Sequence, residues 1–342
     1  MSVPIHSHYD LSSANTLGLP CIAERFAAPA DPKALRDTVA LARAQGWPLT
    51  LLGGGSNLIL PPQLSGLVLT PSMANWWVEE RCDAILVHAE AAVVWHELVM
   101  AMARRGLWGV ENLALIPGHC GAAPIQNIGA YGVELCDVLD AVHVLYLDDG
   151  REAVLSPEQC AFGYRDSIFK GELEGRVVIT RLVLRLSADP TLRLGYGDLQ
   201  ARLGADPTAL EVADAVCAIR REKLPDPARI GNAGSFFKNP LVPGPLARKL
   251  LADHPGMPHF PQPDGAVKLA AGWLIERCGL KGWRDGHFGV HDRQALVLVH
   301  HGGGNADELL AFAGQVAGAV FERFGVVLER EPRLAGGDMR YP

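Results

Sequence analysis

The sequence predicts an α+β fold, in which strands outnumber helices and the two do not alternate regularly. Short apolar or alternating runs, which are typical of strands, are more frequent than helical patterns. The glycine-rich turn at 53–57 joins two apolar runs, whereas the glycines of a Rossmann domain open a helix. Apolar residues make up 49% and charged residues 20% of the 342 residues, so the chain can bury large cores and is not disordered.

Up to residue 105, the spacing of apolar residues and the positions of Gly and Pro predict a helix, then several strands, then a second helix. Asp31 can cap a first helix, Pro32 suits its first turn and Gly46 ends it. In chain order, the predicted elements are a helix at 31–46, strands at 48–52 and 58–60, one or two strands within 66–90, and a helix at 91–105.

The rest of the chain continues this mixture. In the strongest helical pattern, Leu210, Ala213 and Val216 recur at helical spacing, and Pro225 stops the helix. Predicted strands lie at 138–147, 151–155, 176–186, 294–300 and 326–328, and predicted helices at 208–223, 266–278 and 307–324. A linker or loop is predicted at 187–207, and the stretch at 225–265 is predicted to be loop-rich.

Charge and cysteine content exclude several classes of protein. Thirty-one basic and 38 acidic residues give a net charge of −7 without a run of like charge, which argues against binding to nucleic acid or to an anionic membrane. The seven cysteines form no C-x-x-C pair, so neither disulfides nor a metal site is expected. The first residues do not resemble a signal peptide, and no apolar run reaches 18 residues. A soluble, cytoplasmic protein is therefore expected.

Several common catalytic motifs are absent from the sequence. It has no P-loop and no G-x-G-x-x-G, and His96-Glu97 lacks the second histidine of H-E-x-x-H. The run HHGGG at 300–304 is similar to a lipase oxyanion loop, but no G-x-S-x-G supplies a nucleophile. A glycine-rich connection to the next helix is the simpler interpretation of that run.

Two glycine-rich segments are candidates for a binding site. The turn at 53–57 can point consecutive backbone N–H groups toward an anion, although by itself it is more typical of a plain hairpin turn. The segment at 116–132 has no regular period, four glycines, two prolines and almost no charge, which is typical of a functional loop. Together the two suit a large ligand whose phosphates are held by backbone rather than by Lys and Arg.

Three further segments place polar side chains in unusual surroundings. Arg165 lies in YRDS before an apolar pair, Ser235 precedes two aromatic residues, and Glu331 follows the last predicted strand. Taken singly, each is more typical of a turn or of the surface.

Six motifs in order identify a family. They are GGGSN at 53–57, IPG and PIQNIGAYG within 116–132, YRDS at 164–167, KLPDP at 223–227, GNAGSFFKNP at 231–240 and LEREPR at 328–333. This series resembles the UDP-N-acetylenolpyruvoylglucosamine reductase (MurB) family over about residues 10–335, and PIQNIGAYG and GNAGSFFKNP are its most specific parts. LGYGDL, around Tyr196, is similar to the substrate-covering loop of the longer of the two family types.

The resemblance implies an α+β FAD-binding fold of the vanillyl-alcohol-oxidase (PCMH) type with non-covalently bound FAD. It implies two FAD-binding subdomains, at 1–72 (completed by 326–342) and 73–222, and a C-terminal α+β substrate-binding domain at 223–325. It also implies NADPH as co-substrate and UDP-N-acetylglucosamine enolpyruvate as substrate, and we expect a monomer.

Positions within the motifs imply the site residues. Arg165, Ser235 and Glu331 are implied to be catalytic. Those implied to bind substrate are Tyr164, Tyr196, Lys223, Asn239 and Gln294. Those implied to support FAD are Gly53, Gly54, Gly55, Ser56, Asn57, Ile116, Pro117, Gly118, Gly121, Ala122, Pro124, Gln126, Asn127, Gly129, Ala130, Tyr131 and Gly132.

The implied reaction explains these residue types. Hydride passes from NADPH through the flavin to C3 of the enolpyruvyl group, so negative charge develops at C2 and on the attached carboxylate. Arg165, with Glu331 beside it, can stabilise that charge in a dry site, and burial would favour a protonated Glu331. Ser235 is the candidate proton donor to C2, and Lys223 is the candidate partner of a diphosphate or of an NADPH phosphate.

The sequence departs from the family pattern at two places. Pro332 stands where valine is expected, which makes the pose of Glu331 less certain and keeps Glu329, on the same face of a strand, as an alternative. Ala122 and Ala123 stand where hydroxyl residues are expected, so one flavin hydrogen bond would come from backbone.

Two other functions stay open at this point. An FAD oxidase of the same fold could tether its flavin through His119 or Cys120, and acid denaturation would distinguish it because a tethered flavin stays with the protein. A nucleotide-sugar-binding protein without flavin would be colourless.

Overall fold

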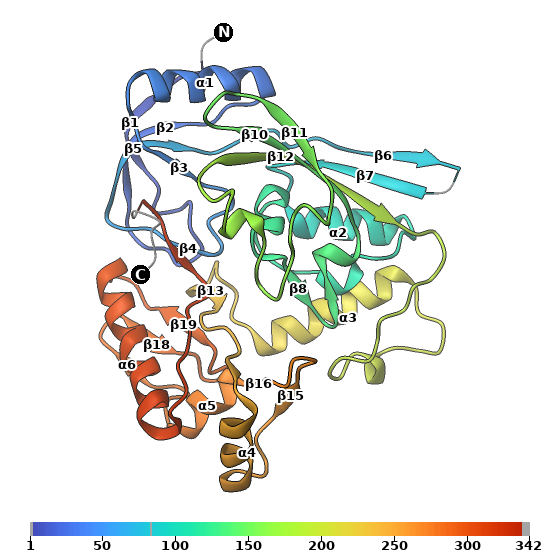
Figure 1. Cartoon of the computed structure of the whole chain (residues 1–342), viewed down its shortest axis with the longest axis vertical. Helices are drawn as coiled ribbons and strands as arrows, with labels where there is room; N and C mark the ends of the chain where they lie inside the picture. Colours follow the sequence, from blue (N-terminus) through green and yellow to red (C-terminus); the bar gives the residue numbers. More distant parts are fainter. Residues whose placement is uncertain (1–2, 83, 337–342) are drawn as a thin grey trace.

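The computed structural model describes residues 3–82 and 84–336 (Figure 1). Its first sheet contains, in spatial order, β1 (His6–Asp10), β2 (Ile22–Ala27), β5 (Gln63–Leu69) and β3 (Leu49–Leu51). β1 is antiparallel to β2, and the other neighbours are parallel. Helix α1 (Pro32–Ala44) begins after Asp31, whose carboxylate accepts a hydrogen bond from Ala34 N. Its Leu35 and Val39 pack against Leu69 of β5.

A short parallel pair joins the early and late parts of the chain. β4 (Leu58–Ile59) follows the glycine turn and pairs with β20 (Arg333–Leu334). Just before this pair, Asn57 Nδ2 donates to Glu331 O at 3.4 Å across 274 positions of sequence. The pairing therefore places Glu331 next to the glycine turn.

The central sheet has five antiparallel strands in the order β11-β10-β12-β7-β6. They are β6 (Trp76–Arg81), β7 (Ala84–Glu90), β10 (Leu139–Tyr146), β11 (Glu152–Leu155) and β12 (Val177–Leu186). Helices α2 (Trp95–Arg104) and α3 (Ala209–Lys223) lie on one side of this sheet (Figure 1). Leu98 of α2 and Val216 of α3 share one core with Leu182 of β12.

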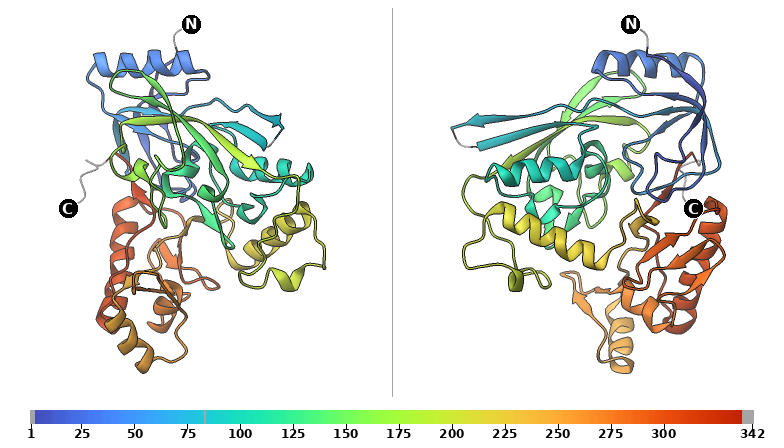
Figure 2. Two further views of the ribbon diagram at one scale, coloured as in Figure 1. Left: turned by 45° about the vertical axis from the view of Figure 1, so that its right-hand side comes forward. Right: turned by 180° about the vertical axis from the view of Figure 1, so that it is seen from behind.

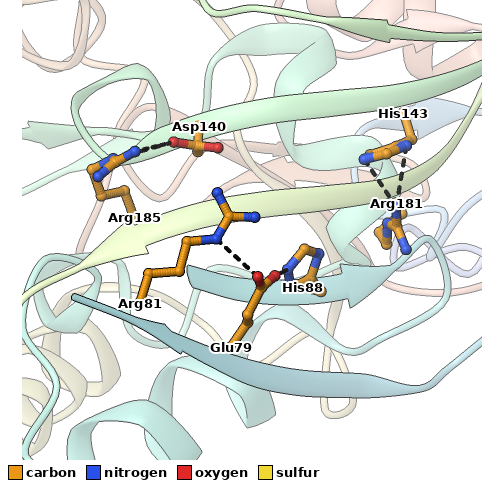
Figure 3. A network of polar contacts seen from close by, with 7 residues as sticks. All are labelled: Glu79, Arg81, His88, Asp140, His143, Arg181 and Arg185. Atoms are coloured by element: carbon orange, nitrogen blue, oxygen red, sulfur yellow. Dashed lines mark hydrogen bonds and ion pairs between the residues drawn. The ribbon is translucent and has the colours of Figure 1, made fainter. Parts of the chain in front are cut away.

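The opposite face of the central sheet carries a polar network (Figure 3). Glu79 Oε2 lies 3.0 Å from His88 Nε2, and Arg181 Nη2 lies 3.0 Å from His143 Nε2. The Trp77 ring stacks on the His88 ring, and the Arg181 guanidinium lies over the Trp77 ring. Burial, and then the charge of Arg181, lower the pKa of His143 to about 4, so its ring stays neutral at physiological pH. These pairs link neighbouring strands across the sheet.

The C-terminal part of the described chain builds two small sheets. Their orders are β13-β19-β18-β17 and β14-β16-β15. The strands are β13 (Gly231–Ser235), β14 (Leu241–Val242), β15 (His259–Pro261), β16 (Val267–Leu269), β17 (Arg284–Asp285), β18 (Phe288–Val290) and β19 (Val297–His300), and the helices are α4 (Gly244–Asp253), α5 (Ala271–Arg277) and α6 (Ala306–Phe324). α6 packs Phe312 and Val316 against Phe288 and Leu298, which gives this part its own core.

The α+β prediction is confirmed, and α1, α2, α3 and α6 lie within a few residues of their predicted bounds. The strand predicted at 326–328 is wrong, because these residues pair with no strand and β20 begins five residues later. The predicted helix at 266–278 is in fact β16 followed by α5. The stretch at 225–265, predicted to be loop-rich, contains α4 and three short strands among its loops. The division into three domains stays a prediction.

Strands β1 and β2 were not predicted. Every residue of β1 is exposed, so this strand has none of the apolar alternation that identifies a half-buried strand. In the described part of the chain, no helix combines the length and the apolar character needed to cross a bilayer.

Candidate active site

The two glycine-rich segments pack directly against each other. A β-carbon on Gly54 would come within 2.9 Å of Gly118 Cα, so glycine is needed for this approach of two backbones. Ser56 Oγ donates to Pro117 O at 3.2 Å, and Asn57 Nδ2 donates to Gln126 Oε1. The segments therefore form one continuous backbone surface.

The turn at 53–57 contains backbone donors that the protein does not use. Within the described residues, none of the five N–H groups from Gly53 to Asn57 has a protein acceptor. Gly55 has a φ of +60°, which allows the chain to curl so that successive N–H groups converge. This donor set fits the diphosphate of a dinucleotide such as FAD, because it binds anionic oxygen without a cationic side chain.

The segment at 116–132 is more ordered than a plain loop. It contains the 3-10 helix η2 (Cys120–Gln126) and the first strand of a hairpin made by β8 (Gly129–Ala130) and β9 (Val133–Glu134). Asn127 follows η2 with φ 44°, and its buried side chain donates to Gly163 O at 3.2 Å and accepts from Cys136 N at 3.0 Å. This asparagine side chain thus shapes the loop, and its contact with FAD stays a prediction.

Arg165 and Glu331 meet beside that hairpin. Arg165 Nε lies 3.4 Å from Glu331 Oε1, and the two side chains are only 21% and 13% exposed. Arg165 Nη2 also donates to Gly129 O at 2.9 Å. The backbone of Arg165 has φ 56°, in a tight turn closed by reciprocal hydrogen bonds between Gly163 and Asp166. A left-handed conformation at a non-glycine residue is enriched at functional sites.

The electrostatics around Glu331 favour an anionic ligand. Burial raises the pKa of Glu331, and the charges of Arg165, Lys170 and Lys238 act in the opposite direction. Lys170 Nζ donates to Arg165 O at 2.8 Å, and burial, reinforced by Lys238, lowers the pKa of Lys170 to about 8. Lys238 is also paired with Glu329. The excess positive charge around Glu331 therefore comes chiefly from Arg165 and Lys170, and a substrate carboxylate would offset part of it.

Ser235 ends β13 next to the segment that carries Glu331. Phe236 O accepts a hydrogen bond from Glu331 N at 2.9 Å, and Phe237 forms a β-bridge with Arg330. Both phenylalanines are fully buried, which fixes the backbone on which Ser235 stands. In the part of the chain that the structure describes, the Ser235 hydroxyl has no hydrogen-bond partner, so it is available to a ligand.

Tyr196 and Lys223 approach the hairpin from a different direction. The Tyr196 ring meets the Tyr131 ring edge-on, with 6.0 Å between the centroids. Lys223 Nζ, at the end of α3, lies 3.5 Å from Asp198 Oδ2. Because that ion pair is exposed and weak, a phosphate could replace Asp198 at little cost.

Asn239 and Gln294 meet at the start of α5. Asn239 Oδ1 accepts from Ala271 N at 3.0 Å, and Gln294 Oε1 would lie 3.2 Å from a β-carbon on Gly272. Burial is the main reason that the pKa of Tyr164 is raised, and hydrogen bonding with Asn239 opposes the shift. The structure thus brings Asn239 to Tyr164 and places Gln294 beside the next residue along α5. Among the described residues, no hydrogen bond or ion pair joins Gln294 or Lys223 to Arg165, Ser235 or Glu331.

Sequence reasoning missed several residues of this region. Lys170 and Lys238 flank Glu331, Lys268 Nζ lies 4.4 Å from the centroid of the Tyr164 ring, and Asn112 bonds the carbonyl of Tyr131. Lys170 stands in an apolar stretch three residues after the YRDS motif, which is a weak signal. Nothing in the local sequence of Asn112 indicates its contact.

An open pocket of about 560 Å³ lies beside the hairpin, between Trp108, Arg185 and Asp189, and Val133 and Arg193 also line it. Its lining mixes both signs of charge and includes none of the predicted site residues. The unused backbone donors and the Arg165–Glu331 pair are a stronger indication of function than this cavity.

Two family models match the chain. Residues 23–156 match an FAD binding domain, and residues 226–335 match the C-terminal domain of UDP-N-acetylenolpyruvoylglucosamine reductase. These matches and the solved structure described next confirm the predicted α+β FAD-binding fold of the vanillyl-alcohol-oxidase type.

Full-length relatives carry the same name. The UDP-N-acetylenolpyruvoylglucosamine reductases of Chromobacterium violaceum and Pseudomonas aeruginosa are each 49% identical to the chain over 98% of its length and 100% of their own. The solved UDP-N-acetylenolpyruvylglucosamine reductase of Thermus caldophilus is 25% identical, with a TM-score of 0.67 over 98% of this chain and 99% of that one. The chain therefore belongs to the UDP-N-acetylenolpyruvoylglucosamine reductase family.

Proposed function

We propose that the protein reduces the enolpyruvyl group of UDP-N-acetylglucosamine enolpyruvate to give UDP-N-acetylmuramate, with FAD as non-covalent cofactor and NADPH as reductant. Family membership supports the reaction. The single structural observation that carries it is the buried Arg165–Glu331 pair, which is hydrogen-bonded to a hairpin of the proposed flavin site. A carboxylate-recognising group beside a dinucleotide site is what this reaction needs.

The proposed cofactor site uses backbone more than side chains. FAD bound along the turn at 53–57 and the segment at 116–132 would supply hydride transfer between NADPH and the substrate. The free N–H groups from Gly53 to Asn57 would hold its diphosphate, and Gly129 to Gly132 would lie near Arg165. Cys120 is fully buried and burial raises the pKa of its thiol, which opposes a covalent tether through that residue.

The proposed catalytic roles follow from charge and hydrogen-bonding capacity. Arg165 would bind the substrate carboxylate and stabilise the negative charge that develops there. Glu331, whose pKa is raised by burial, would hold a proton and donate it in a hydrogen bond to the same carboxylate. Ser235, whose hydroxyl has no partner among the described residues, would deliver a proton to C2.

The remaining proposed contacts concern the nucleotide sugar. Lys223 would pair with its diphosphate, and Tyr196 would cover it. Asn239 and Gln294 would contact it from the C-terminal part, and Tyr164 from the segment that carries Arg165. The product would enter peptidoglycan synthesis, in the cytoplasm, and we expect a monomer with no nucleic-acid or membrane partner.

The test is a direct assay of the purified protein. It should be yellow, release its flavin on acid denaturation, and oxidise NADPH only when UDP-N-acetylglucosamine enolpyruvate is added. A colourless protein, or one that oxidises NADPH equally with and without the nucleotide sugar, would contradict the proposal. Flavin that stays with acid-denatured protein would instead indicate a tethered oxidase.

A further inference from the structure

Asn112 lies outside every motif but connects two parts of the proposed site. It belongs to the 3-10 helix η1 (Glu111–Leu113), and its side chain is fully buried. Its Nδ2 donates to Tyr131 O at 2.8 Å and to Arg193 O at 2.7 Å. Both donor hydrogens of one amide are thus used to hold two carbonyls that come from separate segments.

The first of these carbonyls belongs to a strained turn. Tyr131 and Gly132 connect β8 to β9 with φ 50° and φ 80°, the geometry of a two-residue hairpin turn. Tyrosine is unfavourable in that conformation, so a buried hydrogen bond at its carbonyl helps to keep the turn in place. The Tyr131 ring is held where it meets Tyr196.

The second carbonyl belongs to a segment with few other attachments. Residues 188–198, here called the Tyr196 loop, have no regular structure and are mostly exposed where the chain passes from β12 toward α3 (Figure 2). In the described structure, the backbone of 190–198 makes a single hydrogen bond outside this segment, the one from Asn112 to Arg193. The other attachments are the exposed Lys223–Asp198 pair, the Tyr131–Tyr196 contact and partial burial of Leu194.

We propose that Asn112 is a positioning residue that sets the resting place of the Tyr196 loop by binding it to the hairpin turn at Tyr131. It touches no ligand. It acts by fixing Arg193, three residues before Tyr196, so that the Tyr196 ring stays against the hairpin. Its expected effect on nucleotide-sugar binding rests on the proposed function, whereas its effect on the loop does not.

The Arg193–Leu194 peptide bond provides a direct test. Trypsin must reach the Arg193 carbonyl, which Asn112 binds, so this bond should resist cleavage in the native protein. In Asn112→Ala we expect cleavage there to be at least tenfold faster, measured by mass spectrometry under native conditions. Arg202–Leu203, in the same exposed region but without contact to Asn112, serves as the internal reference.

Matched variants exclude general destabilisation. Asn305→Ala also removes two hydrogen bonds from an asparagine, at the start of α6, and should leave cleavage at Arg193 unchanged. If Asn112→Ala fails to fold, Asn112→Ser gives the same comparison. Equal cleavage at Arg193 in a folded variant and in wild type overturns the proposal, as does wild-type cleavage as fast as at Arg202.

Kinetics test the link to the site. Asn112→Ala should raise the KM for UDP-N-acetylglucosamine enolpyruvate about tenfold while kcat falls less than threefold. In a Tyr196→Ala background, Asn112→Ala should raise this KM less than threefold, because the Tyr196 side chain that the loop presents is already absent. If the double variant raised KM by the product of the two single-variant effects, the positioning role would be overturned. If the protein shows no reductase activity at all, the trypsin experiment still decides whether Asn112 holds the loop.

Discussion

Arg165 shows how much one residue can combine at this site. Its backbone is left-handed, its guanidinium faces a buried carboxyl group, and its Nη2 reaches the carbonyl of Gly129. Lys170 Nζ also donates a hydrogen bond to the backbone carbonyl of Arg165, which helps to hold this residue in place. A lysine at position 165 could make at most one of these directional contacts at a time, because it lacks the planar fork.

Ser235→Ala should separate the two half-reactions. Flavin reduction by NADPH should be spared, whereas reoxidation by the nucleotide sugar should slow by about 10²–10⁴-fold, the usual contribution of a general acid. Stopped-flow absorbance of the flavin measures both steps. Ser156→Ala, at a half-buried serine outside the proposed site, is the control. Equal slowing of both half-reactions would remove the proton-donor role.

Glu331→Gln should change how stability depends on pH. The pKa of Glu331 is raised above its ordinary 4.5, so the stability it adds is full below that pH and is lost as pH rises through the folded-state pKa. The glutamine variant cannot ionise, so it should gain stability relative to wild type between pH 4 and pH 8 in urea unfolding.

Glu329→Gln is the control for that experiment, because this side chain is 72% exposed and pairs with Lys238. It should show no such pH-dependent gain. A constant difference between Glu331→Gln and wild type at both pH values would mean that the pKa of Glu331 is not raised in the folded protein. The same contrast in exposure favours Glu331 over Glu329, despite the Pro332 that follows it.

At the scale of elements, the glycines of the site have a second purpose beside the one that their sequence predicts. The glycine-rich segments predict bare backbone that holds a ligand, but Gly54 is needed because Gly118 lies against it, and Gly231 because a β-carbon there would come within 2.2 Å of Leu17 O. Gly234 has open space beside it and fits the original interpretation. Many glycines of the site thus let two protein segments meet, and the ligand surface is a result of that contact.

Gly54→Ala should therefore weaken FAD binding through packing. Its β-carbon would meet backbone at 2.9 Å, so the two segments must separate. We expect the FAD dissociation constant to rise at least tenfold, measured by flavin fluorescence. Gly204→Ala is the matched control, because its β-carbon would meet nothing within 4 Å. Unchanged affinity in Gly54→Ala would show that the turn does not contact the cofactor.

How far the sequence predicts these elements depends on whether an element carries its own local signal. α3 has helical spacing, a capping box at Thr208 and a proline stop, and its predicted bounds agree with the structure to one residue. β1 and β20 have no such signal, since their pairing depends on partners elsewhere in the chain. The same limit applies to Asn112, whose two carbonyl partners lie outside its neighbourhood in sequence.

For the whole molecule, the proposed cofactor should act as a structural component. Its proposed site lies between the turn at 53–57, which follows β3 of the first sheet, the segment at 116–132, and the residues just before the late strand β20. If FAD binds only the folded state, a free FAD concentration of about 100 times its dissociation constant adds about 2.7 kcal/mol to the free energy of unfolding. For a chain of this size, that gain corresponds to a rise of about 4 °C in Tm.

Removing the flavin and adding it back should reproduce that shift in calorimetry. NADPH without flavin serves as the control and should give a smaller change. A Tm that does not respond to FAD would argue against binding between these segments.

The pairing of β4 with β20 also sets a schedule for synthesis. Glu331, whose backbone oxygen accepts a hydrogen bond from the Asn57 side chain, is made 274 residues after Asn57. At ribosomal speeds the synthesis of the two residues is separated by roughly 15–55 s. During that interval the glycine turn exists without its partner strand, and a chain released early would carry the donors for the cofactor but not the acidic group of the proposed active site. Competence for the reaction thus arises only after the segment that carries Glu331 and β20 has been made.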